Sequence, residues 1–101
     1  MKMLTIVCRE LLEDEVLMLL ESQHITGYTV LNDVGGSGET GKVSGTHGWK
    51  DRNKLFMIAL DDDQIPSIME AVKEFRARLI HEHGNHKVPF RAFLQPCERI
   101  A

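Results

Sequence analysis

Apolar residues change their spacing along the chain, and each change marks a predicted element. Residues 3–8, MLTIVC, are almost wholly apolar with β-branched residues at their centre, which predicts a strand. Acids open the next segment, where a helix dipole favours them. Residues 9–25 also carry an apolar stripe at helical spacing, formed by Leu12, Val16, Leu19 and Leu20. The pattern predicts a strand followed by an amphipathic helix.

The same succession returns in the second half of the chain. Strands are predicted at 28–34, 54–60 and 89–95, and a long loop at 81–88 precedes the last of them. A second helix starts at DDDQ, where the adjacent acids are explained as cap and dipole residues and a proline is tolerated only in the first turn. Its predicted buried stripe comprises Ile65, Ile68, Met69, Val72, Phe75 and Leu79.

The order of elements is β-α-β-β-α-β, which is the ferredoxin-like arrangement. We therefore expect an α+β fold in one domain, residues 1–101, with an antiparallel sheet and both helices on one of its faces. Residues 55–60 are apolar on both faces of their strand, although two helices can cover only one face. An apolar patch of that size rarely faces water in a monomer, so we expect it to be buried against other subunits.

The composition of the chain reduces the number of function classes that need to be considered. The chain has 101 residues, 43% of them apolar, and a formal net charge of -3, which argues against non-specific nucleic-acid binding. No apolar run is long enough to span a bilayer, and the N-terminus turns acidic too early for a signal peptide, so a cytoplasmic protein is expected. Cys8 and Cys97 should lie roughly 20 Å apart on antiparallel neighbouring strands, at about 3.3 Å per residue, which disfavours a disulfide.

A glycine-rich segment of about 36–52 holds the sequence GSGETGKV, which is close to a phosphate-binding P-loop. Val43 stands where that motif needs Ser or Thr, and no helical stripe follows, so the P-loop interpretation fails. Two interpretations stay open for Gly36 and Gly38: loop flexibility, or a close approach of the backbone to a ligand. Asp33 precedes the segment and Glu39 lies within its first glycines, and neither has a partner visible in the sequence.

Three histidines, His81, His83 and His86, form the other cluster with possible chemistry. They would suit zinc, copper or nickel, or they are simply solvated loop residues. We find no nucleophile elbow, no cysteine–histidine pair at a known spacing and no H-E-x-x-H, so the sequence does not favour an enzyme.

Several segments in order resemble the PII signal-transduction proteins, the nitrogen regulatory protein P-II family, over nearly the whole chain. ITGYTV at 25–30 resembles the entry to that family's second strand, and Gly36-Ser37-Gly38 resembles the start of its long T-loop. GNHK at 84–87 resembles the B-loop before the last strand, with its glycine and phosphate-binding lysine. The resemblance implies a homotrimer that binds adenine nucleotides between subunits and uses its T-loop to regulate a partner, such as a membrane transporter.

The resemblance also implies roles for particular residues. The nucleotide would meet Thr29, Gly36 and Gly38, and its phosphates would meet Gly84 and Lys87. Glu98 and Ile100 stand where the family carries two phosphate-binding arginines, and Arg99 lies between them as a further candidate.

These departures favour ADP, AMP or a small anion such as bicarbonate over ATP. The alternative hypothesis is a metal-responsive PII-like protein that uses the three histidines, in a branch linked to heavy-metal efflux.

Overall fold

The computed structural model describes residues 1–38, 41–43, 52–84 and 88–101. The chain opens with a strand whose alternate residues are buried, followed by a short 3-10 turn that leads directly into the first helix. The described elements are β1 (Lys2–Arg9), η1 (Glu10–Leu12), α1 (Glu13–Ser22), β2 (Thr29–Val34), β3 (Gly36–Gly38), β4 (Gly41–Val43), β5 (Asn53–Leu60), η3 (Asp62–Gln64), α2 (Ile65–His83) and β6 (Phe90–Pro96).

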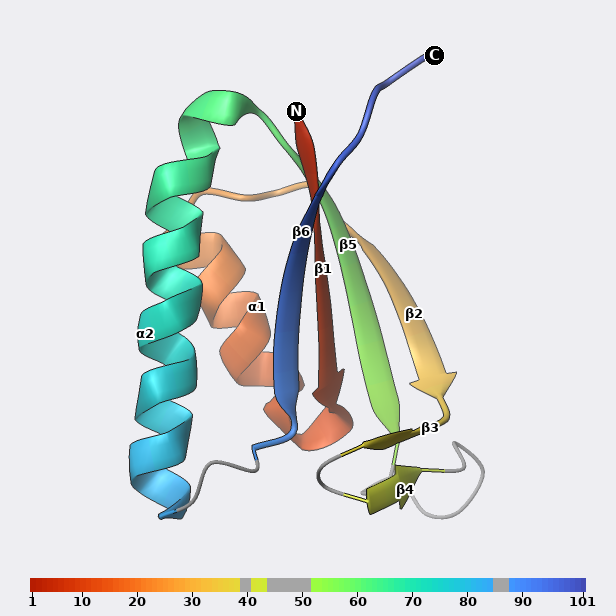
Figure 1. Cartoon of the computed structure of the whole chain (residues 1–101), viewed down its shortest axis with the longest axis vertical. Coiled ribbons are helices and arrows are strands. Elements are labelled where there is room, and N and C mark those ends of the chain that lie inside the picture. The colour runs from red at the N-terminus through yellow and green to blue at the C-terminus, as the bar shows by residue number, and fades with distance from the viewer. Residues whose placement is uncertain (39–40, 44–51, 85–87) are drawn as a thin grey trace.

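Within the described residues, β2, β5, β1 and β6 form one sheet in that spatial order, and every neighbouring pair is antiparallel. Both helices lie on the same side of this sheet, and its other side carries no helix (Figure 1). The predicted α+β, ferredoxin-like fold is confirmed. A bulge between Leu31 and Val34 shifts the pairing of β2 with β5 before the chain leaves the sheet.

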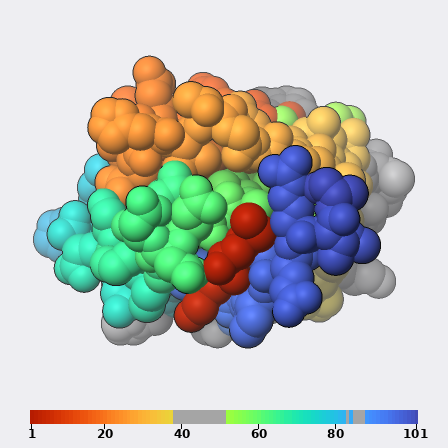
Figure 2. Space-filling view, turned by 90° about the horizontal axis from the view of Figure 1, so that it is seen from above, coloured from red at the N-terminus to blue at the C-terminus, as the bar shows by residue number. Residues whose placement is uncertain are grey.

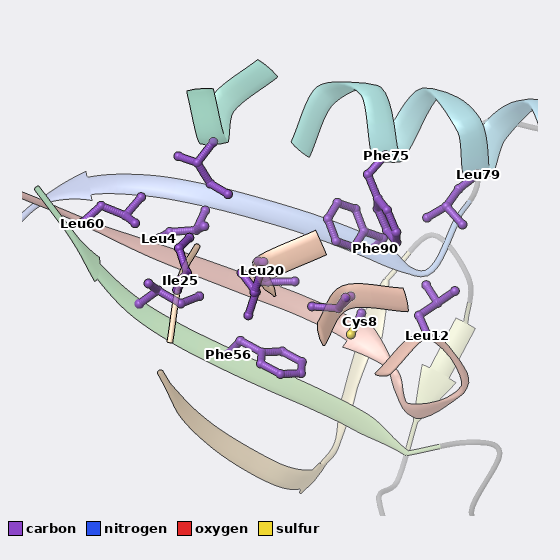
Figure 3. Close-up of a cluster of buried hydrophobic side chains, with 14 of the residues drawn as sticks. Leu4, Cys8, Leu12, Leu20, Ile25, Phe56, Leu60, Phe75, Leu79 and Phe90 are labelled. Atoms are coloured by element: carbon purple, nitrogen blue, oxygen red, sulfur yellow. The ribbon is translucent and has the colours of Figure 1, made fainter. Parts of the chain in front are cut away.

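The core lies between the helices and the sheet, where side chains from all layers meet (Figure 3). Alternation in the strands sends every second residue toward the helices. The fully or almost fully buried residues on the strands are Leu4, Ile6, Cys8, Phe56, Ile58, Leu60 and Phe90. The helices supply Leu12, Val16, Leu20, Ile68, Phe75 and Leu79. Phe75 and Phe90 stack at a tilt with their ring centroids 4.8 Å apart, which joins α2 to the edge strand β6.

Three local expectations were wrong. Met69, predicted in the buried stripe of α2, is 38% exposed, because Ile68 and Phe75 are the residues of that stretch that face the sheet. The second loop was predicted to start at residue 81, but His83 is the last residue of α2. Gly84 caps the helix, and its φ of 67° suits a left-handed cap. The glycine-rich segment is not all loop, because Gly36–Gly38 pairs with Gly41–Val43 as β3 and β4.

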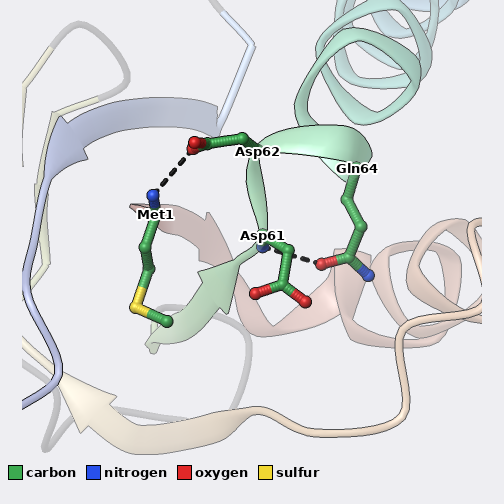
Figure 4. A network of polar contacts seen from close by, with 4 residues as sticks. All are labelled: Met1, Asp61, Asp62 and Gln64. Atoms are coloured by element: carbon green, nitrogen blue, oxygen red, sulfur yellow. Dashed lines mark hydrogen bonds and ion pairs between the residues drawn. The ribbon is translucent and has the colours of Figure 1, made fainter.

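The start of α2 confirms that its acids serve as cap and terminal residues (Figure 4). The Asp61 N–H donates to Gln64 Oε1 at 2.9 Å, and the Met1 ammonium lies 2.7 Å from Asp62 Oδ1. Pro66 sits within the first turn, where its missing N–H costs nothing. The N-terminal residues lie between this turn and the C-terminal segment (Figure 2).

The two cysteines are separated as predicted. Cys8 pairs with Phe90 at one end of β6, whereas Lys2 pairs with Pro96 at the other end, just before Cys97. Both cysteines are free.

Candidate functional site

The sheet face turned away from the helices is open and largely apolar. Neighbouring strands place Thr29, Met57, Thr5 and Phe93 in one row across this face, and Leu31, Leu55, Val7 and Arg91 in the next. We call it the open face. Phe93 is 53% exposed, Leu31 49% and Met57 37%, although a large apolar side chain is normally buried in a lone chain. The face is therefore an apolar surface suited to contact with another protein surface.

A second feature lies where β1 ends, because the bases of both long loops are joined there. The Arg9 N–H donates to the Pro89 carbonyl at 3.1 Å, next to the segment that follows α2. The neighbouring Glu10 N–H donates to the Arg52 carbonyl at 2.8 Å, at the return of the glycine-rich segment. Two backbone hydrogen bonds at successive residues thus hold the two loop bases side by side.

Charged side chains cluster around this junction. Lys54 forms an ion pair with Glu13 at the start of α1, and Arg52 Nη1 lies 3.3 Å from Asp33 Oδ1. Asp33, predicted without a visible partner, therefore has one. Glu10 Oε2 and Arg52 Nε are buried without a hydrogen-bond partner in the part of the chain that is described. Buried polar atoms usually have partners, so this junction can still accept polar contacts.

Cys8 lies on the helix side of the same junction, directly across from Lys54 in the sheet. Burial raises the pKa of the Cys8 thiol to about 12, and the nearby Lys54 charge offsets only part of that rise. The Cys8 thiol is therefore protonated at neutral pH, and it is a core residue rather than a nucleophile.

The residues predicted to contact a nucleotide fall into separate places. Gly36 follows the end of β2, and Gly84 ends α2; both lie at the end of the molecule where β3 and β4 are drawn (Figure 1). Thr29 pairs with Met57, which lies four residues along β5 from Asn53, the residue at the loop end of that strand. At about 3.3 Å per residue, Thr29 is therefore roughly 13 Å from that end of the sheet.

Arg99 lies beyond the opposite end of the sheet. Its guanidinium Nε donates to the Ala101 carbonyl at 2.6 Å. Lys2, which pairs with Pro96, is seven residues from Arg9 at the loop junction, or roughly 20 Å along the strand. One chain therefore does not bring Arg99 to Gly36 and Gly84.

Other predicted positions are only partly described. Gly38 lies in β3, and a β-carbon built on Gly36 would lie 3.9 Å from Asn53 Nδ2, so packing against the described residues does not require glycine at 36. Lys87 lies outside the described residues.

The metal hypothesis is not tested. His81 is an exposed residue of α2, His83 is the last residue of that helix, and His86 lies outside the described residues. No group of three metal-ligating side chains occurs among the residues that are described.

Sequence reasoning missed the charged junction. Glu13 was explained only by the helix dipole, and the partners Arg52 and Asp33 are far apart in the sequence. The available signal was position: Arg9, Arg52 and Lys54 all stand at the ends of predicted strands that the topology makes neighbours.

The family model for nitrogen regulatory protein P-II matches residues 1–100. No curated protein is significantly similar to the chain in sequence. No helix among the described residues is long and apolar enough to cross a membrane.

Among solved structures, the chain is similar to CPII, a nitrogen regulatory PII-like protein from Thiomonas intermedia, bound to ADP, AMP and bicarbonate. The TM-score is 0.73 at 18% identity, with 93% of this chain and 82% of that chain covered. It is also similar to the apo form of CPII, with a TM-score of 0.63 at 17% identity. That match covers 93% of this chain and 85% of the CPII chain. A putative PII-like signaling protein from Thermus thermophilus gives a TM-score of 0.59 at 18% identity. That match covers 93% of this chain and 83% of the Thermus chain.

Proposed function

The chain belongs to the nitrogen regulatory protein P-II family, and from that premise we propose that it is a homotrimeric, non-enzymatic sensor. In this proposal, clefts between subunits bind ADP, AMP or a small anion such as bicarbonate. The bound ligand then sets the conformation of a T-loop, residues 36–52, which regulates a partner protein such as a membrane transporter. Proteins of this family are signalling regulators.

The observation that carries the proposal is the open face. Met57, Leu31 and Phe93 are each more than a third exposed, on three different strands of one sheet. Burying apolar surface is worth about 25 cal/mol per Å², so a surface of this kind favours association. Two sister copies packed against it would cover it and create clefts along the seams between subunits.

The separation of the predicted ligand contacts supports a site built from two copies. Gly36 and Gly84 lie at one end of the sheet, whereas Arg99 lies beyond the other. A neighbouring subunit could bring its Thr29 and Arg99 toward the loop junction of the first, which a single chain does not do. Glu10 Oε2 and Arg52 Nε at that junction, which have no hydrogen-bond partner among the described residues, are further polar groups available to a ligand or a loop residue.

The choice of ligand follows from charge. Lys87 would be a point-charge donor to phosphate, and Gly84 beside it has the left-handed backbone that lets the chain turn there. Glu98 would repel a triphosphate, and Ile100 supplies no cation in return. A ligand with fewer phosphates suits this set better than ATP. Among the similar structures, CPII is bound to ADP, AMP and bicarbonate, to ADP and bicarbonate, or to ADP, AMP and acetate.

Calorimetric titration of the full chain with ATP, ADP, AMP and bicarbonate tests the proposal. We expect binding of ADP or AMP, weaker binding of ATP, and loss of at least roughly tenfold in nucleotide affinity for Lys87→Ala, since a charged hydrogen bond contributes about 1.5–3 kcal/mol. The matched control is Lys73→Ala, which removes a lysine of α2 and should leave affinity unchanged. Absence of binding by all four ligands would refute the sensor, and equal affinities for the two variants would remove Lys87 from the site.

A further inference from the structure

The outer surface of the helix layer has a groove that neither the core nor the open face uses. It runs between α1 and α2 and has a volume of about 770 Å³. Along α2 it extends from Ala71 to Glu82, which is roughly 16 Å at about 1.5 Å per residue. That length corresponds to about three turns of a helix laid against it.

Between its charged residues the groove has apolar and polar lining, namely Met18, Leu19, Ala71 and Phe75 together with Ser22 and Gln23. Phe75 is 5% exposed and belongs to the core, and Leu19 packs against that core. Met18 stands on the α1 side and is 68% exposed, so its side chain is available to a partner. Flexible methionine side chains are common at surfaces that bind amphipathic helices, because they adapt to the partner's shape.

The rim of the groove is acidic. Glu15 lies on the α1 side, and Glu74 and Glu82 lie on the α2 side. Arg78, which also lines the groove, is already engaged: its guanidinium lies 5.2 Å from the centre of the Phe75 ring, and its Nε is 3.8 Å from Glu82 Oε1. The charge that a ligand would meet along the two sides is therefore negative.

We propose that this groove binds an amphipathic helix rich in lysine and arginine, supplied by another protein. The apolar face of that helix would cover Met18, Leu19 and Ala71, and its basic side chains would meet Glu15 and Glu74. Helix-in-groove docking needs this combination of apolar lining and complementary charges at the rim. The groove is lined by residues of α1 and α2. Both helices lie on the side of the sheet opposite the open face (Figure 1), so the proposed trimer would leave the groove accessible. The inference does not depend on the nucleotide site.

The test uses a labelled 18-residue helical peptide with leucine on one face and lysine on the other, titrated with the full chain by fluorescence anisotropy. A peptide of the same composition with its leucines dispersed is the ligand control. We expect clear binding of the first peptide, weaker binding of the second by roughly tenfold or more, and weaker affinity as salt rises, because salt screens rim charges.

Two pairs of substitutions place the peptide. Glu15→Gln with Glu74→Gln should weaken binding about fivefold, since exposed charge pairs contribute about 0.2–1 kcal/mol each. Asp63→Asn with Glu98→Gln removes the same charge from sites outside the groove and should leave the affinity unchanged. Met18→Gln should weaken it roughly tenfold or more, because it removes an apolar anchor without changing the charge of the groove. Circular dichroism confirms that each variant is folded.

Equal affinity for the two peptides, or equal effects of the two double variants, would overturn the proposal. So would amide chemical-shift changes on the open face instead of along residues 15–23 and 71–82. If sedimentation showed that Met18→Gln abolishes an association between copies of the chain, the occupant would be a second copy, and the proposed partner would be wrong.

Discussion

The two faces of the central sheet have apolar side chains in similar positions but are covered very differently. On β5, Phe56 and Ile58 point to the helices and are at most 1% exposed, whereas Met57 between them points to the open face and is 37% exposed. The covered face holds the fold of one chain together. The open face leaves comparable apolar side chains uncovered within one chain, and in the proposed trimer they would lie between subunits. Alternation along one strand thus separates the residues of the core from those of the proposed contact.

The largest effect is expected on the covered face. Phe56→Ala should lower the free energy of unfolding by about 3–5 kcal/mol, because it removes a fully buried ring and leaves a cavity. Urea unfolding followed by circular dichroism measures this loss. Phe93→Ala is the matched control on the open face, and in dilute protein it should cost much less. A loss below about 1 kcal/mol for Phe56→Ala would mean that the covered face is not the core.

The two cysteines compare the covered face of the sheet with a partly exposed position beyond the end of β6. With its pKa raised to about 12 from the ordinary 9.0, the Cys8 thiol should form roughly a thousandfold less thiolate than an unperturbed one. Cys97 is partly exposed, beyond the end of β6. Iodoacetamide at pH 8, followed by mass spectrometry, should therefore label Cys97 in the native protein and Cys8 only after unfolding. Equal rates in the native protein would show that the helices do not seal this side of the sheet.

The open face is tested by placing a charge on it. Met57→Asp should weaken association of the subunits by at least roughly a hundredfold, because an unpaired carboxylate would be buried between them. Met69→Asp is a closely matched control, since Met69 is 38% exposed on α2, and it should leave association unchanged. Size-exclusion chromatography over a dilution series distinguishes the two. If both variants dissociate equally, the open face is not the specific contact.

The smallest effect belongs to the contact between Met1 and Asp62, which lies at the end of the sheet and on neither face. Their hydrogen bond lowers the pKa of the Asp62 carboxyl from 3.8 and raises the pKa of the Met1 amine from 8.0. The stabilisation that this contact gives the fold is therefore complete between pH 3.8 and pH 8.0. It is lost as pH falls through the lowered pKa of Asp62, or rises through the raised pKa of the amine.

Asp62→Asn should consequently lower the melting temperature slightly at pH 6, and the difference from the original chain should shrink at pH 2 and at pH 10. The pair is exposed, so the difference should stay small throughout. A difference that is the same at all three pH values would show that Asp62 acts through the helix start and not through Met1.

The main elements could be predicted because periodicity reports which residues are buried. Alternation at 55–60 predicted two apolar faces, and the element order predicted that helices cover only one. The sequence does not indicate which of the two faces stays open, because Leu55 and Phe56, which point to opposite faces, are equally apolar. The extension of α2 to His83 was predictable in principle, because Gly84 is a typical helix cap, but the polar residues before it show no stripe.

The candidate site was less predictable. β3 and β4 are three residues each and rich in glycine, so no periodicity announces them. The pairing of Asp33 with Arg52 exists only because the chain returns to the sheet beside its own exit. The nucleotide contacts at Thr29, Gly36, Gly38, Gly84, Lys87 and Arg99 remain predictions, because the site that we propose would be shared between subunits and one chain does not contain it.

The account rests on association through the open face, and sedimentation equilibrium of the unmodified chain at micromolar concentration tests it most directly. We predict a particle of three times the 11.5 kDa chain mass, reduced toward one chain by Met57→Asp. A stable species of one chain mass over the whole concentration range would contradict the account, because the clefts proposed to bind the ligand would then not form.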